Sequence, residues 1–397
     1  MILNAPWTDR EGFTALIAAL GGAEQARVVG GAVRDTLLEI DVADIDVATR
    51  LAPETVVTRL EEAGIRAVPT GLAHGTITAV LPSGPVEVTT LRRDVSTDGR
   101  HATVAFTDDW REDAARRDFT MNALYADPES GVVFDYFGGL DDLAARRVRF
   151  IGDPLKRIAE DHLRILRFFR FLARFGNEPD AQGLAACATR ARDLMALSRE
   201  RIADELLKLL VARDAVRVVA LMVERDILSP VLPEIDAEGV IRLSRLADNE
   251  AAARVVPQAI RRLAALLPAD PAVARDIGAR LRLSNIQRKR LESAAVSDDG
   301  TDPRAMAYRI GVDPALDRLL LAGRTVAPLD GWTPPRLPLS GGVLVARGLS
   351  KGPLVAATLK RIEDRWIGEG FPGDDRLAAI TDDAVAQALT DDSSRNA

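Results

Sequence analysis

The sequence contains one cysteine, Cys187, and three histidines among 397 residues. One thiol cannot form a disulfide within the chain, which excludes a disulfide-stabilised fold and is typical of a reducing cytoplasm. No apolar run approaches the length of a membrane span. Asp9, Arg10 and Glu11 lie where a signal peptide would have its apolar core. These absences predict a cytoplasmic globular protein without membrane contact.

The sequence also lacks an excess of basic residues, because 52 lysines and arginines face 59 acidic residues and give a formal net charge of −7. This balance argues against indiscriminate binding of nucleic acid, although local basic patches remain available for phosphate contacts. Aromatic residues make up only 5% of the chain, which is typical of a helix-rich protein. A chain of 397 residues exceeds what one core usually supports, so two to four domains are expected.

Two adjacent glycines, Gly30 and Gly31, are the first feature that indicates a function. They end a short apolar run and precede a stretch without helix breakers that extends to Leu38. This order predicts a strand, a tight turn and a helix. Glycines at such a turn let the backbone approach a phosphate, free N–H groups of the helix favour the anion, and Arg34 adds charge. A simple turn without a ligand is the alternative.

A pair of aspartates follows, Asp44 and Asp46, in a segment that reads as a strand over residues 44–48. Strand alternation would place both carboxylates on one face. Paired carboxylates beside a phosphate site suggest Mg²⁺ and phosphoryl or nucleotidyl transfer. A hairpin is expected from residues 76–80 and 86–90. Its Glu87 is either a third carboxylate of the site or a solvent-facing residue.

The next stretches predict less structure. Residues 92–109 are polar and charged without periodicity, which predicts a long, functional loop. Arg116 and Arg117 follow it and could hold a triphosphate or ribose, or could be surface charges. Residues 135–143 read as a loop that closes the first domain.

From Pro154 the pattern becomes helical. Arginines recur every third residue after Asp161, at Arg164, Arg167 and Arg170. A spacing of three falls short of the helical repeat by about 60° per step, so one flat ligand cannot contact all four and their roles should differ. A basic helix face exposed to water is the alternative.

The second half of the chain reads as a series of helices. Ser198 is expected to cap a helix on which Arg201 and Glu205 form a structural i,i+4 pair. Helical patterns continue through 213–226, 250–267, 272–282, 285–296 and 314–323. A cluster of basic residues over 280–290 has no acidic residue until Glu292. A proline-rich linker spans residues 334–338, and a last helix extends from Gly352 to Trp366. Residues 388–397 read as a frayed tail.

Four of these motifs, in this order, resemble the class II (bacterial-type) CCA-adding tRNA nucleotidyltransferase and poly(A) polymerase family. The matching elements are Gly30-Gly31-Ala32-Val33-Arg34-Asp35, Asp44-x-Asp46, Arg116-Arg117-Asp118-x-Thr120-x-Asn122-Ala123-Leu124 and Glu160-Asp161-x-x-Arg164. The helix with Arg201 and Glu205 resembles the neck motif of that family. The resemblance covers roughly residues 27–210.

The resemblance implies a fold class and a division into parts. The expected fold is α+β, with a small N-terminal nucleotidyltransferase (polymerase-β-like) mixed sheet and an all-α C-terminal half. The parts would be a head at 1–150, a neck at 151–225, a body at 226–330 and a tail at 331–397 that contacts tRNA.

The resemblance also implies a role for each site residue, with the 3′ end of tRNA as acceptor and CTP and ATP as substrates. The carboxylates of the metal site would hold Mg²⁺, with Glu87 as a further catalytic carboxylate. The other residues would bind the nucleotide through its triphosphate, ribose or base. The metal ligands would be Asp44 and Asp46, and the nucleotide contacts Gly31, Arg34, Arg117, Asp118, Asp161, Arg164, Arg167 and Arg170.

The resemblance implies that Asp161 and Arg164 read the base, and hydrogen-bond chemistry makes this assignment sensible. Cytosine and adenine both present an exocyclic amine beside a ring-nitrogen acceptor, whereas uracil and guanine reverse that order. A carboxylate acceptor beside a guanidinium donor therefore suits C and A. Each mismatch that leaves a buried polar group unpaired costs about 1–3 kcal/mol.

Several alternatives stay open. Poly(A) polymerases of the family usually carry a basic segment at the position of residues 70–76. The segment of this chain is not of that kind and resembles the CCA-adding form. Relatives that add only A or only C are poorly separated by sequence. A small-molecule nucleotidyltransferase and a non-catalytic RNA-binding relative are further alternatives. No His-Asp phosphohydrolase module is expected, because no histidine follows His162. One departure from the family is Glu39, where glycine is more usual.

Overall fold

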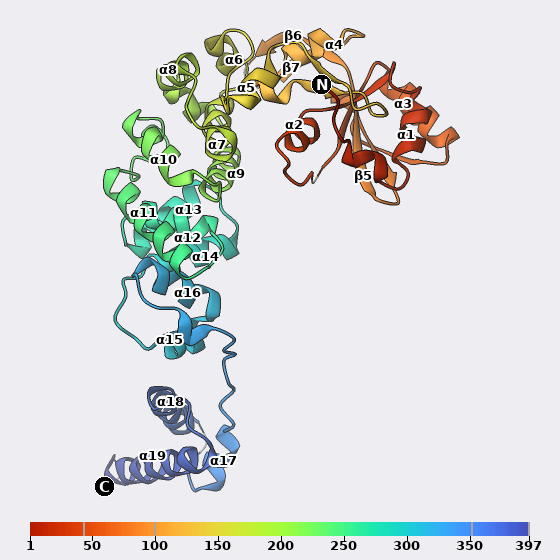
Figure 1. Cartoon of the computed structure of the whole chain (residues 1–397). Coiled ribbons are helices and arrows are strands. Elements are labelled where there is room, and N and C mark those ends of the chain that lie inside the picture. The colour runs from red at the N-terminus through yellow and green to blue at the C-terminus, as the bar shows by residue number, and fades with distance from the viewer. Residues whose placement is uncertain (43, 99–100, 351, 396–397) are drawn as a thin grey trace. The chain divides into compact units, whose positions relative to one another are not determined.

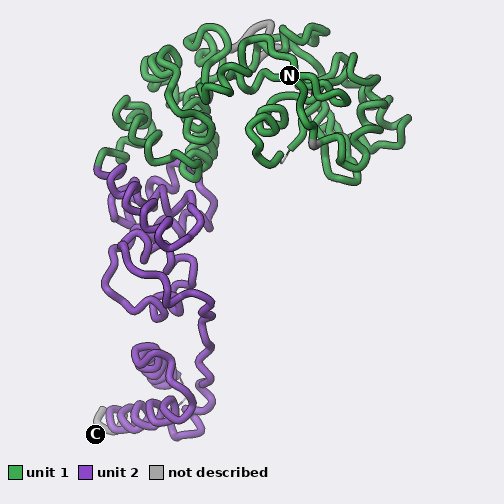
Figure 2. The backbone as a smooth tube through the Cα atoms, in the orientation of Figure 1, with its two compact units in different colours: residues 1–237 green, residues 238–397 purple. Residues whose placement is uncertain are grey.

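The computed structural model describes residues 1–42, 44–98, 101–350 and 352–395, which form two compact units (Figure 2). Unit 1 spans Met1–Ala237 and unit 2 spans Glu238–Ala397. Unit 1 contains a mixed sheet followed by helices, and the described part of unit 2 is helical (Figure 1). The expected α+β fold with a helical C-terminal half is therefore confirmed. The division at 150, 225 and 330 stays a prediction.

A seven-stranded sheet forms the centre of the N-terminal part, in the order β3-β4-β5-β2-β1-β8-β9. Only β2 and β5 are parallel, and the other neighbours are antiparallel. The register places Asp46 on β2 directly beside Glu87 on β5. The strands are β1 (Ala26–Val29), β2 (Asp46–Thr49), β3 (Arg66–Gly71), β4 (Thr76–Leu81), β5 (Gly84–Thr90), β8 (Leu124–Ala126) and β9 (Val133–Asp135).

Ten α-helices of unit 1 surround and follow this sheet. Helices α1 and α3 contact each other, α3 also contacts β3 and β4, and α2 contacts β1 and β8. Pro53 begins α3 at a position where its missing N–H costs nothing. The helices are α1 (Phe13–Leu20), α2 (Gly31–Leu37), α3 (Pro53–Glu62), α4 (Trp110–Ala115), α5 (Gly139–Ala144), α6 (Pro154–Glu160), α7 (Arg164–Phe175), α8 (Ala181–Thr189), α9 (Arg199–Leu210) and α10 (Ala215–Glu224).

A group of phenylalanines packs together where the sheet meets the following helices. The Phe119 ring lies 5.0 Å from that of Phe150 and 5.1 Å from that of Phe171 on α7. Phe150 stacks on Phe168, with 5.5 Å between ring centroids. Phe119, Phe150 and Phe168 are fully buried. This apolar joint fixes α7 against the sheet and so positions the arginines of α7 relative to the strands.

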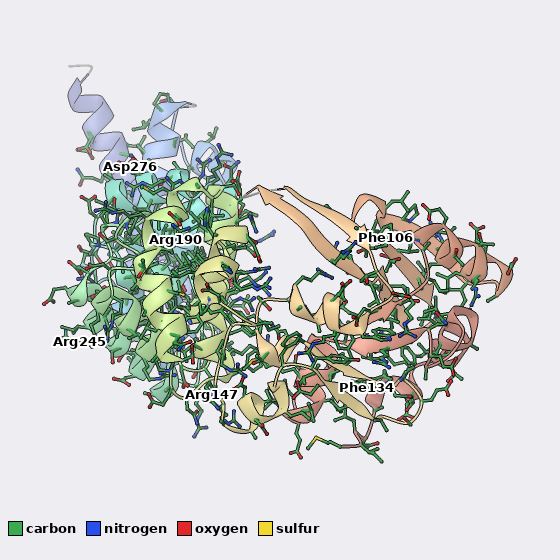
Figure 3. The ribbon with its side chains drawn as sticks, turned by 90° about the horizontal axis from the view of Figure 1, so that it is seen from above. Phe106, Phe134, Arg147, Arg190, Arg245 and Asp276 are labelled. Atoms are coloured by element: carbon green, nitrogen blue, oxygen red, sulfur yellow. The ribbon has the colours of Figure 1, made fainter. Side chains whose placement is uncertain are left out.

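The expected loop over residues 92–109 is wrong for its described part. Strands β6 (Arg92–Asp98) and β7 (His101–Phe106) pair antiparallel in a separate two-stranded sheet, and residues 99–100 lie outside the described residues. A ribbon of two strands pairs through its backbone and needs no apolar face, so the alternation that reveals other strands is missing. At the base of this ribbon, the ring of Phe106 (labelled in Figure 3) packs against Gly75. A Cβ atom at Gly75 would lie only 2.8 Å from that ring, so only glycine fits at this position.

Two further expectations of irregular structure are wrong. The segment 135–143 contains the start of α5, whose residue Gly139 approaches the Thr120 carbonyl so closely that a Cβ would lie 2.3 Å away. At the C-terminus a final helix, α19, extends to Arg395 instead of fraying from residue 388, and Ala388 is buried in a core. Alternating small and acidic residues hid the apolar stripe of α19 from sequence inspection.

Unit 2 contains the remaining helices and a buried network of charges. Arg261 is 1% exposed and donates hydrogen bonds to Glu250 at 2.8 Å and to Asp317 at 3.1 Å. Asp317 also binds Arg290, so the predicted basic cluster without a nearby acid is wrong at Arg290. The helices are α11 (Ala237–Ala252), α12 (Ala259–Leu266), α13 (Pro271–Arg280), α14 (Asn285–Ala294), α15 (Pro303–Ile310), α16 (Val312–Leu321), α17 (Gly341–Ala346), α18 (Pro353–Gly368) and α19 (Asp374–Arg395).

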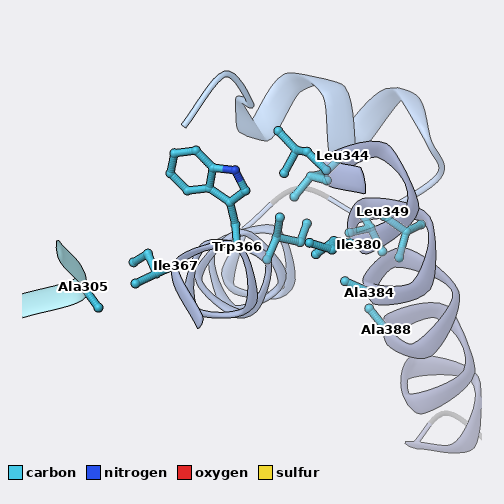
Figure 4. Close-up of a cluster of buried hydrophobic side chains, with 11 residues drawn as sticks. Ala305, Leu344, Leu349, Trp366, Ile367, Ile380, Ala384 and Ala388 are labelled. Atoms are coloured by element: carbon cyan, nitrogen blue, oxygen red, sulfur yellow. The ribbon is translucent and has the colours of Figure 1, made fainter. Parts of the chain in front are cut away.

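The last three helices have a hydrophobic core of their own after the expected proline-rich linker. Trp366 and Ile367 of α18 pack with Leu344 of α17 and Ile380 of α19, and Ala305 of α15 joins the same cluster (Figure 4). Among the described residues, none of the helices combines the length and the apolar character that crossing a membrane requires. Cys187 is fully buried in α8, and burial raises the pKa of its thiol.

The end of α2 accommodates the departure from the family at Glu39. Glu39 has a φ of 56°, in the left-handed region that favours glycine. The next N–H, of Ile40, donates to the Asp35 carbonyl at 2.9 Å and closes the helix end. The backbone therefore keeps a glycine-like conformation although the side chain is that of glutamate.

We predict that Glu39→Gly raises the free energy of unfolding by about 0.5–1 kcal/mol, because relief of left-handed strain (about 1–2 kcal/mol) exceeds the entropic cost of glycine (about 0.5–1 kcal/mol). Urea titration followed by circular dichroism measures the change. Thr58→Gly, inside α3, is the control and should lower stability because glycine is a poor helix former. A lower stability of Glu39→Gly would contradict the interpretation.

Candidate active site

One cavity of unit 1, which we call the central cavity, contains nearly all the predicted site residues. Its volume is about 760 Å³, and its wall includes seven arginines against four aspartates. It thus has the positive charge that a polyanionic ligand requires. The lining residues are Gly30, Gly31, Arg34, Asp44, Asp46, Arg92, Arg116, Arg117, Asp118, Asn122, Asp161, Arg164, Arg167, Arg170 and Phe171. Of the eleven predicted site residues, only Glu87 is missing from this wall.

The two aspartates lie together at the start of β2. The strand begins at Asp46, so Asp44 precedes it and the expected alternation over 44–48 does not explain its position. Both side chains are exposed and line the central cavity. Glu87 is exposed beside Asp46, as the parallel register of β2 and β5 requires.

Desolvation and the like charges of Glu87 and Asp44 raise the pKa of Asp46, and Arg117 partly opposes them. A carboxylate whose neighbours disfavour its charged form is one that a cation would stabilise, so these residues fit a divalent metal. Among the described residues, no group of three histidine, cysteine or acidic side chains is close enough to hold a metal ion. Because Mg²⁺ takes six oxygen ligands, two carboxylates would share it with phosphate oxygens or water.

The glycine turn has the geometry that requires glycine. Gly30 has a φ of 72° and precedes α2, and a Cβ at this position would lie 3.3 Å from a guanidinium nitrogen of Arg117. Arg34 is 6% exposed and donates to Asp35 at 2.7 Å and to Asn122. Its guanidinium lies 4.3 Å from the centroid of the Phe175 ring. Arg34 is thus held by α7 as well as by its own helix.

A bidentate pair joins the sheet to α7 at the cavity wall. Arg167 donates two hydrogen bonds to Asp118 Oδ2, at 2.8 Å from Nε and 2.5 Å from Nη2. Asp118 Oδ1 accepts from the Phe119 N–H at 2.8 Å and from Asn122 at 3.0 Å. Burial acts to raise the pKa of Asp118, but Arg167 and these hydrogen bonds lower it overall. Asp118 therefore stays ionised.

The predicted base-reading residues are held apart by different partners. Asp161 ends α6, and its Oδ2 accepts a hydrogen bond from Arg201 of α9 at 2.8 Å. Arg164 begins α7 and donates to Glu160 and, at 3.1 Å, to the Arg116 carbonyl. Neither side chain uses the other as a partner, so an acceptor and a donor face the cavity with fixed orientations.

The predicted ion pair between Arg201 and Glu205 is wrong. Arg201 binds Asp161, and Glu205 accepts from Arg170 and lies 3.7 Å from Arg167. Glu205 is buried, and its carboxylate binds the arginines of α7 in preference to Arg201, which lies on the same helix. The two residues on α9 therefore orient the cavity residues on α6 and α7. Spacing on one helix could not reveal a partner on another.

Phe171 was missed as a lining residue, yet it explains how arginines three apart reach one cavity. Its ring lies 4.6 Å from the Arg170 guanidinium, 5.4 Å from that of Arg167 and 5.2 Å from that of Arg34. Long side chains lie across this ring and converge although their Cα positions wind around α7. The expected division of roles stays a prediction.

Other contributors were also missed. Arg92, from the start of β6, was assigned to a loop, and Asn122 belonged to a motif without a role of its own. Asp113, on α4, accepts hydrogen bonds from Arg116 at 2.8 Å and Arg117 at 3.2 Å but does not line the cavity. A carboxylate three residues before an arginine is a detectable signal, since both lie on one helical face.

The chain is similar in sequence to known nucleotidyltransferases over most of its length. The family model described as "Poly A polymerase head domain" matches residues 26–149, and the one described as "Probable RNA and SrmB-binding site of polymerase A" matches residues 178–238. The human mitochondrial CCA tRNA nucleotidyltransferase 1 is 34% identical over 370 residues, which cover 87% of this chain and 84% of the human protein. The chain belongs to the CCA-adding enzyme and poly(A) polymerase family. It is a nucleotidyltransferase.

Other members of the CCA-adding enzyme and poly(A) polymerase family agree with this assignment. The CCA-adding enzyme of Anoxybacillus flavithermus is 38% identical over 224 residues, which cover 55% of each chain. The structure of the Bacillus stearothermophilus CCA-adding enzyme in complex with CTP is similar over 95% of this chain and 99% of that chain, with a TM-score of 0.73 and 26% identity. A Thermotoga maritima CCA-adding enzyme complexed with tRNA shares the fold, with a TM-score of 0.70, 17% identity and 98% of each chain covered.

We predict that Asp46→Asn raises the free energy of unfolding at neutral pH in metal-free buffer, because it removes a charge that desolvation and the repulsion from Glu87 both disfavour. A folded-state pKa above the usual value means that the ionised form is penalised in the fold. The advantage of asparagine should therefore be fully present above that raised pKa and disappear as pH falls towards the ordinary value for aspartate. Urea titrations at several pH values test this, with Glu87→Gln expected to act in the same direction. Destabilisation by Asp46→Asn at neutral pH would contradict it.

Proposed function

We propose that this nucleotidyltransferase adds C and A from CTP and ATP to the 3′ end of tRNA without a nucleic-acid template. The observation that carries the proposal is the convergence of three groups on one cavity: the Asp44–Asp46 pair, the arginines, and the fixed acceptor and donor of Asp161 and Arg164. The names of the relatives above support the same activity.

The chemistry of the site matches attack of a 3′-hydroxyl oxygen on the α-phosphorus, with cleavage of the bond to the bridging oxygen and release of pyrophosphate. Asp44 and Asp46 would hold Mg²⁺, with Glu87 adding negative charge. When bound, Mg²⁺ lowers the pKa of the attacking hydroxyl and balances the charge of the leaving pyrophosphate. No histidine base is needed.

Arginines of the head and of α7 would neutralise the incoming triphosphate. Gly31 and Arg34 lie at the glycine turn, and Arg117 lies beside Gly30. Asp118 and Arg167, bound to each other, would contact the ribose and phosphate from a fixed position. Arg170 would orient the base-reading residues, since Glu205 holds it from the opposite side.

Base selection would use the two groups that separate partners hold in place. Asp161 accepts from the exocyclic amine of C or A, and Arg164 donates to the ring nitrogen. Uracil and guanine would each make two mismatches, which together cost about 2–6 kcal/mol. Poly(A) addition by the same fold, and addition of A or C alone, are the competing activities. A cytoplasmic location stays a prediction, because the human relative carries a mitochondrial name.

The deciding experiment uses tRNAs that end at the discriminator base, at C and at CC, each incubated with one labelled nucleotide and Mg²⁺. We expect C addition to the first two substrates and a single A on the third, resolved on sequencing gels. Unlimited A addition would indicate a poly(A) polymerase, and transfer to a small alcohol but not to tRNA would indicate a small-molecule enzyme.

Three variants test the base and metal assignments. Asp161→Ala is expected to lose discrimination against UTP and GTP, while Asp46→Ala abolishes all transfer. Arg201→Met keeps the Asp161 carboxylate but removes its partner, so it should relax selection less than Asp161→Ala does. Ratios of kcat/KM for the four nucleotides give the measure. Full turnover by Asp46→Ala would reject the metal assignment, and unchanged selectivity of Asp161→Ala would reject the base assignment.

A further inference from the structure

One buried carboxylate outside the wall of the central cavity organises three residues of that wall. Asp113 is 1% exposed. Its Oδ1 accepts hydrogen bonds from Arg116 Nε at 2.8 Å and from the Arg92 backbone N–H at 3.2 Å. Its Oδ2 accepts from the Tyr125 hydroxyl at 2.6 Å and from Arg117 at 3.2 Å. Three of these four donors line the cavity, whereas Asp113 and Tyr125 do not.

We infer that Asp113, supported by Tyr125, is a positioning residue that sets the affinity of the cavity for the triphosphate of CTP and ATP. This inference rests on the proposed function. Asp113 does not touch the nucleotide and acts through Arg116 and Arg117.

The argument starts from the repulsion between the two adjacent arginines. Arg116 and Arg117 both carry a positive charge and both belong to the cavity wall, so without a counter-ion they would separate and turn towards solvent. Asp113 binds both from behind. Burial acts to raise the pKa of Asp113, but Arg117, Arg116 and the Tyr125 hydroxyl lower it to about 2. Asp113 is therefore ionised throughout the physiological range and holds both guanidiniums in place.

Tyr125 makes this arrangement rigid. Its hydroxyl donates to Asp113 and accepts from Arg117 Nε at 3.3 Å, so Tyr125 and Asp113 together hold the Nε–Nη2 edge of that guanidinium. Its ring packs at 5.6 Å from Trp110 and at 6.0 Å from Tyr136, measured between ring centroids. Tyr125 is fully buried. A side chain held on all sides presents its hydroxyl in one orientation, and Arg117 is thereby kept beside the Gly30 turn.

The contact with Arg92 extends the role of Asp113 to the β6–β7 ribbon. Arg92 is the first residue of β6, and its side chain donates to the His74 carbonyl at 2.8 Å. The same carboxylate thus binds the base of the ribbon and the two arginines that follow α4. A shift of the ribbon base would change the position of the arginines through Asp113.

The test is Asp113→Asn, a change that keeps the shape of the side chain and removes its charge. We expect the Kd for CTP in the presence of Mg²⁺, measured by isothermal titration calorimetry, to rise 10- to 100-fold. The kcat at saturating CTP should change less than threefold, and the KM for tRNA should stay unchanged. Tyr125→Phe should weaken CTP binding 3- to 10-fold and provides the answer if Asp113→Asn does not fold. Unchanged CTP affinity in a folded variant would overturn the inference.

Asp142 provides a closely matched control within the same unit. It is also 1% exposed, and it accepts hydrogen bonds from Arg149 at 2.8 Å and the Thr120 hydroxyl at 2.7 Å and pairs with Arg147 at 2.9 Å (Arg147 is labelled in Figure 3). None of these partners lines the central cavity. Asp142→Asn should lower stability as Asp113→Asn does, yet leave the Kd for CTP within twofold. Equal losses of affinity in the two variants would show general loosening and overturn the inference.

A mutant cycle separates positioning from structural support. In a background in which both Arg116 and Arg117 are changed to Gln, Asp113→Asn should weaken CTP binding less than threefold, because both groups through which it acts are gone. Equal effects in both backgrounds would contradict the inference. Failure of the proposed function can be distinguished from failure of this inference. In the first case the wild-type enzyme would bind CTP without extending tRNA. In the second case wild-type CCA addition would be intact and the affinities of the variants for CTP would be unchanged.

Discussion

The pair of hydrogen bonds from Arg167 to Asp118 is the interaction on which the site depends. Asp118 follows α4 on the sheet side and Arg167 lies on α7, so the pair joins the two halves of the cavity wall. The chain of contacts continues from Asp118 through Asn122 to Arg34, and from Arg167 to Glu205. One connected polar framework therefore extends from Arg34 at the glycine turn to Glu205 on α9, and the apolar joint holds α7 beside it.

This framework also explains how an acidic protein can carry a strongly basic cavity. Buried or half-buried carboxylates bind most of the cavity arginines from the outer side, as Glu205 does for Arg170 and Asp113 for Arg117. Each guanidinium has several N–H donors, so one edge can be held while another remains available. The carboxylates reduce repulsion among the arginines, and the orientation of each charge is fixed before a nucleotide arrives. Local geometry, rather than net charge, makes the site suitable for polyphosphates.

Much of the site could be predicted from sequence because its residues occur in short motifs. Asp44 and Asp46 are two residues apart, and the glycine turn precedes its helix directly, so local spacing suffices to bring each group together. The partners of Asp161 and Arg170 could not be found in this way, because Arg201 and Glu205 reach them from a different helix. The i,i+4 rule even suggested a wrong pair, because the half-buried Arg170 of α7 binds Glu205 and Arg201 of the same helix does not.

The fold shows the same division between local and distant information. Helices with a clear apolar stripe, such as α3 and α9, were visible in the sequence. The β6–β7 ribbon and α19 were not, because strand pairing through the backbone and an apolar stripe separated by alanine and acidic residues leave weak patterns. Asp113 was overlooked for a related reason: its importance lies in four partners, of which two, Arg92 and Tyr125, are distant in sequence.

The burial of Cys187 has a practical consequence for studies of motion. The chain has no other cysteine, and this one is enclosed in α8 with its thiol kept protonated by its apolar surroundings. Thiol-directed reagents need an accessible thiolate, so the native chain should react slowly with maleimides. A cysteine introduced on the exposed face of α18, for example at Lys360, could then be labelled selectively with a fluorophore or spin probe, without first removing the native residue.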